Sequence, residues 1–306
     1  MAVTDTLAAE YRVLTEGRGL VDRSARGRLA LTGPEAKAFL QGQVTNDVEG
    51  LEPGTGCYAA FLDHKGKMQG DLRILDTGEE LLLDTERSAL QPLLNMIRRY
   101  KLGMDLELHK RTLETAQLSL IGPAARETVA GTEEHAHRMA DIGGRPVRLV
   151  TTDLGYDVIC AAEDADAVRA ALEAEPVSDA AAEIVRVESG RPRWGVDLDE
   201  SVIPQEAGLN ERAVSFTKGC YVGQETVARL HYRGKPNRHL RGLRFSEAVP
   251  TGTPLLLGER QVGIVRSSVV SPRLGPIGLA IVRREAEPGA TLAAGETTAE
   301  VVSVPF

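Results

Sequence analysis

The chain has 306 residues, of which 42% are hydrophobic and 26% charged, which is ordinary for a globular protein of two or three domains. Its formal net charge of −8 argues against direct nucleic-acid binding, and no apolar run approaches the roughly 20 residues that span a bilayer. The N-terminus has no basic region followed by an apolar stretch, so we expect no secretory signal, no membrane partner and a cytoplasmic location.

Helices and strands alternate irregularly through the first 175 residues, and hairpins recur among them. This pattern predicts an α+β fold with mixed or antiparallel sheets, and it argues against a doubly wound parallel sheet. We expect helices over residues 7–14, 34–40, 90–101, 123–130 and 166–175. We expect strands over residues 19–22, 27–32, 57–62, 67–75, 81–83, 105–109, 117–121, 147–151 and 156–161.

The predicted hairpin of residues 57–75 carries the first candidate site residue. Its second strand alternates between an apolar face and a polar face that holds Asp71 and Arg73. One interpretation is an exposed ion pair that contributes little to stability. The other is a carboxylate, Asp71, that lines a cleft.

Cysteine and histidine patterns argue against a metal site, and we predict none. Cys57, Cys160 and Cys220 are odd in number and far apart, unlike a disulfide framework or a zinc motif. An iron–sulfur cluster normally takes more thiolates than the three that this chain offers. His135-Ala136-His137 has no acidic or cysteine partner at ligand spacing, so we expect an exposed loop there.

A helix capped by Asp179 and ended by Gly190 would place Glu188 in its last turn. A carboxylate there opposes the helix dipole by roughly 0.3–1 kcal/mol, so something should compensate. The compensation could come from the nearby Arg191 or Arg193. It could instead come from a ligand with two adjacent donors, such as the edge of a pterin or guanine. Trp194 would be a stacking wall for such a ligand or a residue of the core.

The stretch from Lys218 to Glu225 is dense in functional groups. Cys220 follows Gly219, and Lys218 would place a cation near its sulfur and favour the thiolate. A helix that begins at about Gly223 would act in the same direction. The simpler interpretation is a tight turn with a buried cysteine.

From residue 236 onward the sequence consists of short β-rich segments between Gly and Pro turns, which is typical of a small β-barrel. We therefore predict two domains, residues 1–235, which could hold two subdomains, and residues 236–306. The join is basic, because residues 229–244 hold six Arg or Lys and no acid. This run is either a solvated linker or a site for an anionic ligand. The expected strands cover residues 240–245, 255–257, 262–270, 277–282 and 300–304.

Four segments together carry a family resemblance over essentially the whole chain. The octapeptide Lys218-Gly-Cys-Tyr-Val-Gly-Gln-Glu225 resembles the signature of the YgfZ family. Arg186-x-Glu188-x-Gly190, with Trp194-Gly195 and Asp197 after it, resembles a stretch of the wider superfamily. That superfamily includes the T-protein of glycine cleavage, an aminomethyltransferase. Residues 45–48 and 63–75 are similar to it as well.

The resemblance implies a folate-binding N-terminal region followed by a C-terminal β-barrel. The implied cofactor is tetrahydrofolate or a one-carbon derivative of it. Glu188 would hold the pterin edge, and Asp71 falls where T-proteins keep the aspartate of aminomethyl transfer. Cys220 would be the key residue of the YgfZ activity, with Lys218 beside it. The other expected cofactor-binding residues are Trp194, Tyr221, Gln224 and Arg229.

The function we expect is that of a monomeric folate-binding protein that assists assembly or repair of iron–sulfur clusters. Its partners would be iron–sulfur client enzymes, tRNA-modifying enzymes among them. One alternative is a folate-dependent aminomethyl or one-carbon transferase that uses Asp71, although T-proteins lack the cysteine signature. Another is a non-catalytic folate sensor or scaffold. The sequence leaves open whether the protein is an enzyme.

Overall fold

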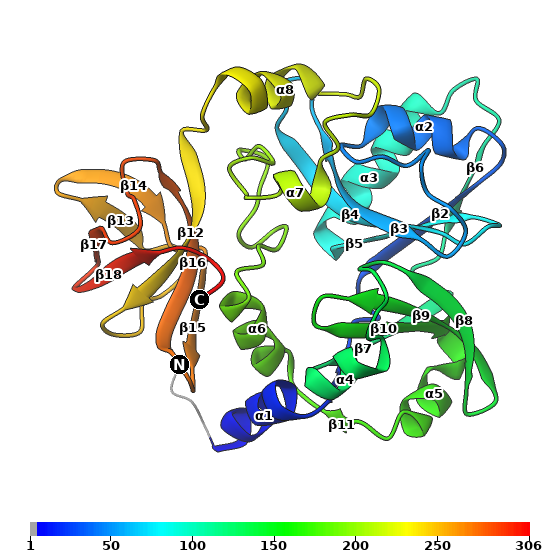
Figure 1. The fold of residues 1–306 in the computed structure, drawn as a ribbon, viewed down its shortest axis with the longest axis horizontal. Coiled ribbons are helices and arrows are strands. Elements are labelled where there is room, and N and C mark those ends of the chain that lie inside the picture. The colour runs from blue at the N-terminus through cyan, green and yellow to red at the C-terminus, as the bar shows by residue number, and fades with distance from the viewer. Residues whose placement is uncertain (1–4) are drawn as a thin grey trace.

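The computed structural model describes residues 5–306 and arranges them as three sheets around a central connecting segment (Figure 1). Residues 1–4, which belong to the N-terminus that we expect to lack a secretory signal, lie outside the described part. In Figure 1 the C-terminal sheet lies on the left and the two N-terminal sheets on the right, with helix α6 (Asp179–Glu188) between them. The predicted α+β class is confirmed.

The five-stranded sheet is antiparallel, with strand order β3-β4-β5-β2-β6. Helices α2 and α3 cover one face, where Leu72 and Ile74 of β4 are buried. Side chains alternate along a strand, so Asp71 and Arg73 point to the other face. That face is buried too, which contradicts an exposed ion pair: Asp71 is 6% exposed and Arg73 7%. The elements are β2 (Gly27–Thr32), α2 (Ala36–Gln43), β3 (Gly56–Leu62), β4 (Met68–Asp76), β5 (Leu81–Thr85), α3 (Arg87–Tyr100) and β6 (Glu107–Lys110).

The six-stranded sheet has the order β11-β1-β7-β10-β9-β8, and only the β1–β11 pair is parallel. The expectation of an exposed loop at His135–His137 is right that residues 135 and 136 lie in a loop, but it is wrong about their exposure and about His137. His137 begins β8 in a hairpin with β9, and both histidine side chains are largely shielded from solvent. The elements are α1 (Asp5–Glu16), β1 (Gly19–Asp22), β7 (Thr115–Ile121), α4 (Pro123–Thr128), β8 (His137–Ile142), β9 (Arg145–Thr152), β10 (Gly155–Ala161), η1 (Ala162–Asp164), α5 (Ala165–Ala171) and β11 (Glu175–Pro176).

The C-terminal sheet is a curled antiparallel barrel-like sheet around its own apolar core, as predicted. Its strand order is β14-β13-β17-β18-β12-β16-β15. The single strand expected over 262–270 is two strands, because the chain turns at Val265 and Arg266. The strands are β12 (Arg238–Phe245), β13 (Pro254–Leu257), β14 (Arg260–Ile264), β15 (Ser267–Ser271), β16 (Gly275–Arg283), β17 (Thr291–Ala294) and β18 (Thr297–Val302). The domain division at residues 235 and 236 stays a prediction.

Residues 178–233 connect the three sheets. Ser178, not Asp179, caps α6, since its Oγ accepts from the Ala181 amide at 3.3 Å. Beyond α6 an irregular stretch packs Trp194 and Leu209 against the five-stranded sheet. Helices α7 (Asn210–Ala213) and α8 (Gln224–Arg233) follow. This segment therefore places groups from all three sheets within reach of one another.

Within residues 5–306, no helix is both long enough and apolar enough to cross a membrane.

Candidate functional site

A hollow of about 280 Å³, here called the Asp71 hollow, lies where the two N-terminal sheets meet the segment after α6. Tyr58 and Asp71 come from β3 and β4, Asp157 from β10, and Trp194 from the connecting segment. Arginine and carboxylate side chains dominate the lining, which suits a polar ligand with both donors and acceptors. The seven arginines are Arg23, Arg26, Arg73, Arg186, Arg191, Arg193 and Arg212. The six carboxylates are Asp71, Asp84, Glu86, Glu134, Asp153 and Asp157.

Asp71 is a buried carboxylate that one neighbour holds. The Tyr58 hydroxyl donates to its Oδ2 at 2.7 Å, while Oδ1 accepts no hydrogen bond from the described residues. Burial raises the pKa of Asp71 to about 6, although the Tyr58 hydrogen bond and the charge of Arg26 pull it down. A carboxyl with this pKa exchanges a proton readily near neutral pH. Asp71 therefore has the burial and the free oxygen of a group that receives or delivers a proton.

The strand that carries Asp71 is fixed by a buried charge network. Arg73 lies 2.7 Å from Asp157 of the six-stranded sheet and 2.9 Å from Asp84 of its own sheet. Arg26 lies 2.8 Å from the same Asp84 and also pairs with Glu86. Arg73 thus joins the two N-terminal sheets at the floor of the hollow. Partners on both sheets over-determine the geometry around Asp71.

His135 lies in the same hollow, on the loop before β8. Its side chain is 12% exposed. Burial and the charges of Arg73 and Arg212 lower the pKa of His135 to about 3, so the ring is neutral at physiological pH. The hollow therefore contains one neutral imidazole among its charged groups.

Glu188 lines a second hollow of about 640 Å³, here called the Glu188 hollow. The two hollows share two wall residues, Ile121 and Leu154. Glu188 and Asp71 are therefore neighbours across a common wall, not members of one pocket.

Protein groups already satisfy the Glu188 carboxylate. Tyr11 donates to both oxygens at 2.9 and 3.0 Å, Ser271 donates to Oε1, and Arg273 donates to Oε2 at 3.2 Å. The prediction that Arg191 or Arg193 compensates the charge of Glu188 is wrong, because Arg191 pairs with Asp153 and Arg193 with Glu183. The barrel supplies the cation that offsets the unfavourable helix dipole. A pterin at Glu188 would have to replace some of these donors.

Lys218 serves the backbone at the end of α2. Its Nζ donates to the carbonyl oxygens of Gln41, Val44 and Asn46 at 2.6, 2.8 and 2.8 Å. Burial lowers the pKa of Lys218 to about 8. The charge of Lys218 acts on the thiol of Cys57. Burial nevertheless raises the pKa of Cys57 to about 12. Activation of Cys220 by Lys218 stays a prediction.

Cys220 is exposed on a loop that packs against the β3–β4 hairpin through Gly223. Gly223 has φ +83° and precedes α8, as expected for a helix that begins near it. A Cβ at Gly223 would lie 2.5 Å from the carbonyl oxygen of Asp63, in the turn of the β3–β4 hairpin. The loop therefore rests directly on the turn of the hairpin that carries Asp71 in its second strand, and the thiol faces solvent. The simpler interpretation of a buried cysteine is wrong.

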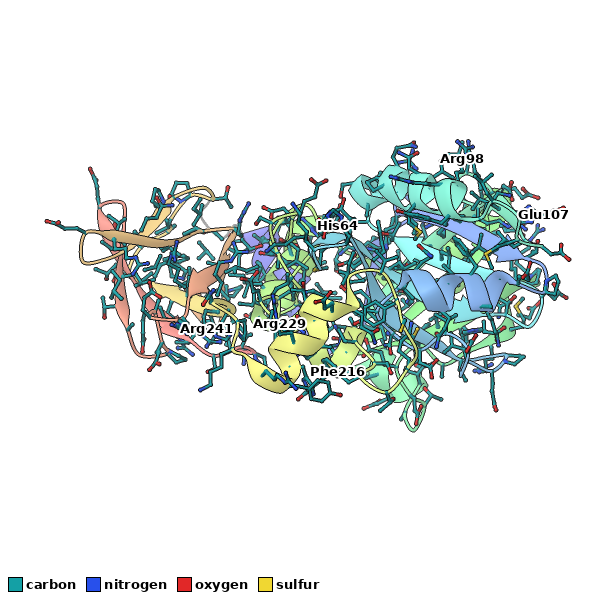
Figure 2. All side chains as sticks on the ribbon, turned by 90° about the horizontal axis from the view of Figure 1, so that it is seen from above. His64, Arg98, Glu107, Phe216, Arg229 and Arg241 are labelled. Carbon is teal, nitrogen blue, oxygen red and sulfur yellow. The ribbon has the colours of Figure 1, made fainter. Side chains whose placement is uncertain are left out.

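The remaining residues of this loop and helix lie outside both hollows. Tyr221 is buried beneath Lys218, with the ammonium 5.1 Å from its ring centroid. Gln224 is at the first turn of α8, and Arg229 is exposed further along it. Figure 2 shows Arg229 on α8 and Phe216 beside that helix, where Phe216 stacks on His231 with ring centroids 3.7 Å apart. Tyr221, Gln224 and Arg229, which we predict to contact folate, line neither hollow, because the loop and α8 lie against the turn of the hairpin.

The structure thus brings together Asp71 and Trp194 from the predicted set, places Glu188 across a wall, and separates Cys220 from all three. Tyr58 and His135 were missed. Tyr58 stands two residues before Ala60, the cross-strand partner of Asp71, which is a signal that hairpin register could have given. His135 had no such signal, since its place depends on the packing of two sheets. Among residues 5–306 no cluster of ligating side chains is arranged to hold a metal ion.

Comparison with known proteins places this geometry in a family. Residues 1–218 match the model of the GCVT N-terminal domain, and residues 238–306 match the glycine cleavage T-protein C-terminal barrel domain. The chain belongs to the glycine cleavage T-protein family. The predicted resemblance to this superfamily is therefore confirmed.

Relatives within the T-protein family carry two kinds of name. An aminomethyltransferase of Rubrobacter xylanophilus is 30% identical, over 98% of this chain and 86% of the relative. A tRNA-modifying protein YgfZ of Vibrio vulnificus is 29% identical, over 78% of this chain and 73% of the relative. The crystal structure of glycine cleavage system aminomethyltransferase T from Bartonella henselae superposes with a TM-score of 0.86 at 20% identity. It covers 98% of this chain and 89% of that one, and it shows the shared fold.

Proposed function

We propose that this protein binds a tetrahydrofolate in the Asp71 hollow and assists assembly or repair of iron–sulfur clusters in client enzymes of the cytoplasm. Cys220 would be the group that meets the client. The observation that carries the proposal is the buried, arginine-lined hollow around Asp71 in a member of the T-protein family. The client role rests on the YgfZ resemblance and on the similarity to a YgfZ protein.

The residues present fit a folate. A pterin edge combines N–H donors with acceptors, and the hollow offers both carboxylates and arginines. Trp194 supplies an apolar wall for a planar ring. The Glu188 hollow of about 640 Å³ adjoins the Asp71 hollow across Ile121 and Leu154, so the rest of an elongated ligand would have to displace these two side chains to enter it. A bound folate would supply nitrogen atoms that carry one-carbon groups.

Cys220 works apart from the folate in this proposal. Its thiol is solvent-exposed on a docked loop, so a client protein can reach it without opening the hollow. The folate would stabilise the hairpin beneath the loop, since Asp71 and Gly66 belong to the same β3–β4 hairpin. The two halves of the function would then be coupled through that hairpin.

Calorimetric titration of the wild-type protein with (6S)-tetrahydrofolate tests the first half. We expect binding, which Asp71→Ala weakens and Cys220→Ala leaves unchanged. Absence of binding by the wild-type protein would overturn the proposal.

Complementation of a deletion strain tests the second half. Cys220→Ala should fail to restore the activity of iron–sulfur enzymes, while Cys57→Ala, at a thiol of raised pKa, should restore it if it folds. Full restoration by Cys220→Ala would remove the role of the cysteine.

A second candidate function is folate-dependent aminomethyl transfer. The observation that favours it is the raised pKa of Asp71 beside Tyr58, in a chain 30% identical to an aminomethyltransferase. Asp71 would hold or accept the proton of the folate nitrogen that takes the one-carbon group. The test is turnover of an aminomethylated carrier protein in the presence of tetrahydrofolate. Turnover by wild type that Asp71→Asn abolishes would favour this function over the first.

A further inference from the structure

Three buried polar atoms of residues that line the Asp71 hollow have no hydrogen-bond partner among the described residues: Nδ1 of His135, and Nε and Nη2 of Arg73. Nη2 still forms the ion pair with Asp84 at 2.9 Å, whereas Nδ1 and Nε have no polar partner. Both residues line the hollow. A Cβ on Gly56 would lie 3.2 Å from the Cβ of His135, and Tyr58, two residues further along the same strand, is the cross-strand partner of Arg73, so His135 and Arg73 lie over neighbouring positions of the β3–β4 hairpin. Native proteins rarely leave such atoms unpaired, because each costs about 1–3 kcal/mol.

The backbone of His135 is unusual as well. Its φ is +71°, in the left-handed region that a residue with a Cβ rarely adopts. Hydrogen bonds hold the loop there, since the His135 amide donates to Thr151 at 2.9 Å and the Thr151 amide donates to Ala136 at 2.9 Å. Backbone strain of this kind concentrates at functional sites and persists where the surroundings impose it. The loop therefore holds the imidazole at the hollow against its own backbone preference.

His135 and Arg73 can both act as hydrogen-bond donors, so the ligand atom that they contact should be an acceptor. Arg73 Nε is a donor only. A neutral imidazole donates from one nitrogen, and Nε2 of His135 lies 3.8 Å from Glu134, too far for a hydrogen bond that would fix the tautomer. Nδ1 is therefore free to carry the proton. Arg212 adds positive charge nearby.

We infer that His135 and Arg73 form a subsite that donates hydrogen bonds to an acceptor oxygen of the bound ligand. The subsite rests on the proposed folate function and adds to it the contact that orients the ligand beside Asp71. In a folate the oxygen has two sources, the pterin carbonyl and the carboxylates of the glutamate tail. Nδ1 of His135 and Nε of Arg73 are both shielded from solvent in the structure, so the contact requires the imidazole to turn about χ2 as the ligand binds.

The test compares His135→Gly with wild type by calorimetry against (6S)-tetrahydrofolate. Glycine adopts a positive φ freely, so the variant should keep its melting temperature while tetrahydrofolate binds about tenfold more weakly. His64→Ala, at an exposed histidine of the hairpin turn, is the matched control and should bind like wild type (Figure 2). Wild-type affinity in His135→Gly would overturn the subsite.

Two fragments separate the sources of the oxygen. 6-Methyltetrahydropterin lacks the tail, and p-aminobenzoylglutamate lacks the pterin. The fragment whose binding His135→Gly weakens contains the acceptor oxygen. If the substitution weakens the binding of neither fragment, the inference is wrong.

A second measurement decides the matter if His135→Gly does not fold. In ¹⁵N-histidine-labelled wild type, saturating tetrahydrofolate should shift the ring nitrogen signals of His135, assigned by their absence in His135→Asn. Binding without such a shift would overturn the subsite alone, whereas absence of any binding would overturn the proposed function together with it.

Discussion

The buried position of Asp71 lowers the stability of the folded protein, and the same burial gives its carboxyl group a pKa suited to proton transfer. Its carboxylate is buried on the second face of β4, where the Tyr58 hydroxyl and the charge of Arg26 compensate only in part for the lost water. Because burial raises the pKa from 3.8 to about 6, the folded protein binds this proton more tightly than the unfolded chain does. Stability therefore falls as the pH rises between these two values and stays low above them.

Asp71→Asn should stabilise the protein while it harms function. The amide carries no charge and still accepts from Tyr58, so the free energy of unfolding at pH 7 should rise by on the order of 1–3 kcal/mol. The gain should grow between about pH 4 and pH 6 and be constant above, as measured by urea denaturation across that range. Tetrahydrofolate binding, or transfer if it occurs, should weaken. A gain independent of pH would show that the charge is not its cause.

The loop of residues 218–223 is the element that decides where the signature cysteine lies. Lys218 attaches its start to the end of α2, and the amide of Val222 donates to Gly42 at 3.2 Å. Gly223 then lies against the hairpin turn, where Gly66 also has a positive φ of +80°. The two glycines of the octapeptide differ, since a Cβ on Gly219 would meet nothing within 4 Å.

Gly223→Ala should undock the loop, whereas Gly219→Ala should not. The added Cβ at Gly223 meets a backbone oxygen at 2.5 Å and a left-handed φ, so we expect a loss of about 1–3 kcal/mol in the free energy of unfolding. Iodoacetamide labelling of Cys220, read by peptide mass spectrometry, should also change in rate. Equal behaviour of the two alanine variants would mean that the loop does not depend on this contact.

At the scale of the whole molecule, Glu188 joins three parts of the chain. Tyr11 comes from α1, Glu188 from α6, Ser271 from the end of β15 in the barrel, and Arg273 from the turn that follows β15. A second junction runs parallel to it, in which Arg186 and Ser267 both bind Asp197. The barrel is therefore attached to the N-terminal region through buried charges, whose removal one at a time leaves partners unpaired.

Glu188→Ala should destabilise the protein without any folate present. We expect a loss of about 3 kcal/mol in the first urea transition, because the hydroxyls of Tyr11 and Ser271 and the guanidinium of Arg273 lose their acceptor. Glu225→Ala, at an exposed carboxylate of α8, is the control and should be silent. Unchanged stability with lost tetrahydrofolate binding would instead support the pterin role predicted for Glu188.

The sequence by itself determined most of the local elements and the family, because hydrophobic period, turn residues and the octapeptide are properties of neighbouring residues. It placed β1, β2 and the β3–β4 hairpin closely, and it named Asp71 as a cleft residue. Only the tertiary structure decided which side chains meet. Arg73 pairs with Asp157, Glu188 with the barrel, and His135 with the Asp71 hollow, all across sheets. Such contacts depend on how separate sheets pack, and no local pattern in the chain records that packing.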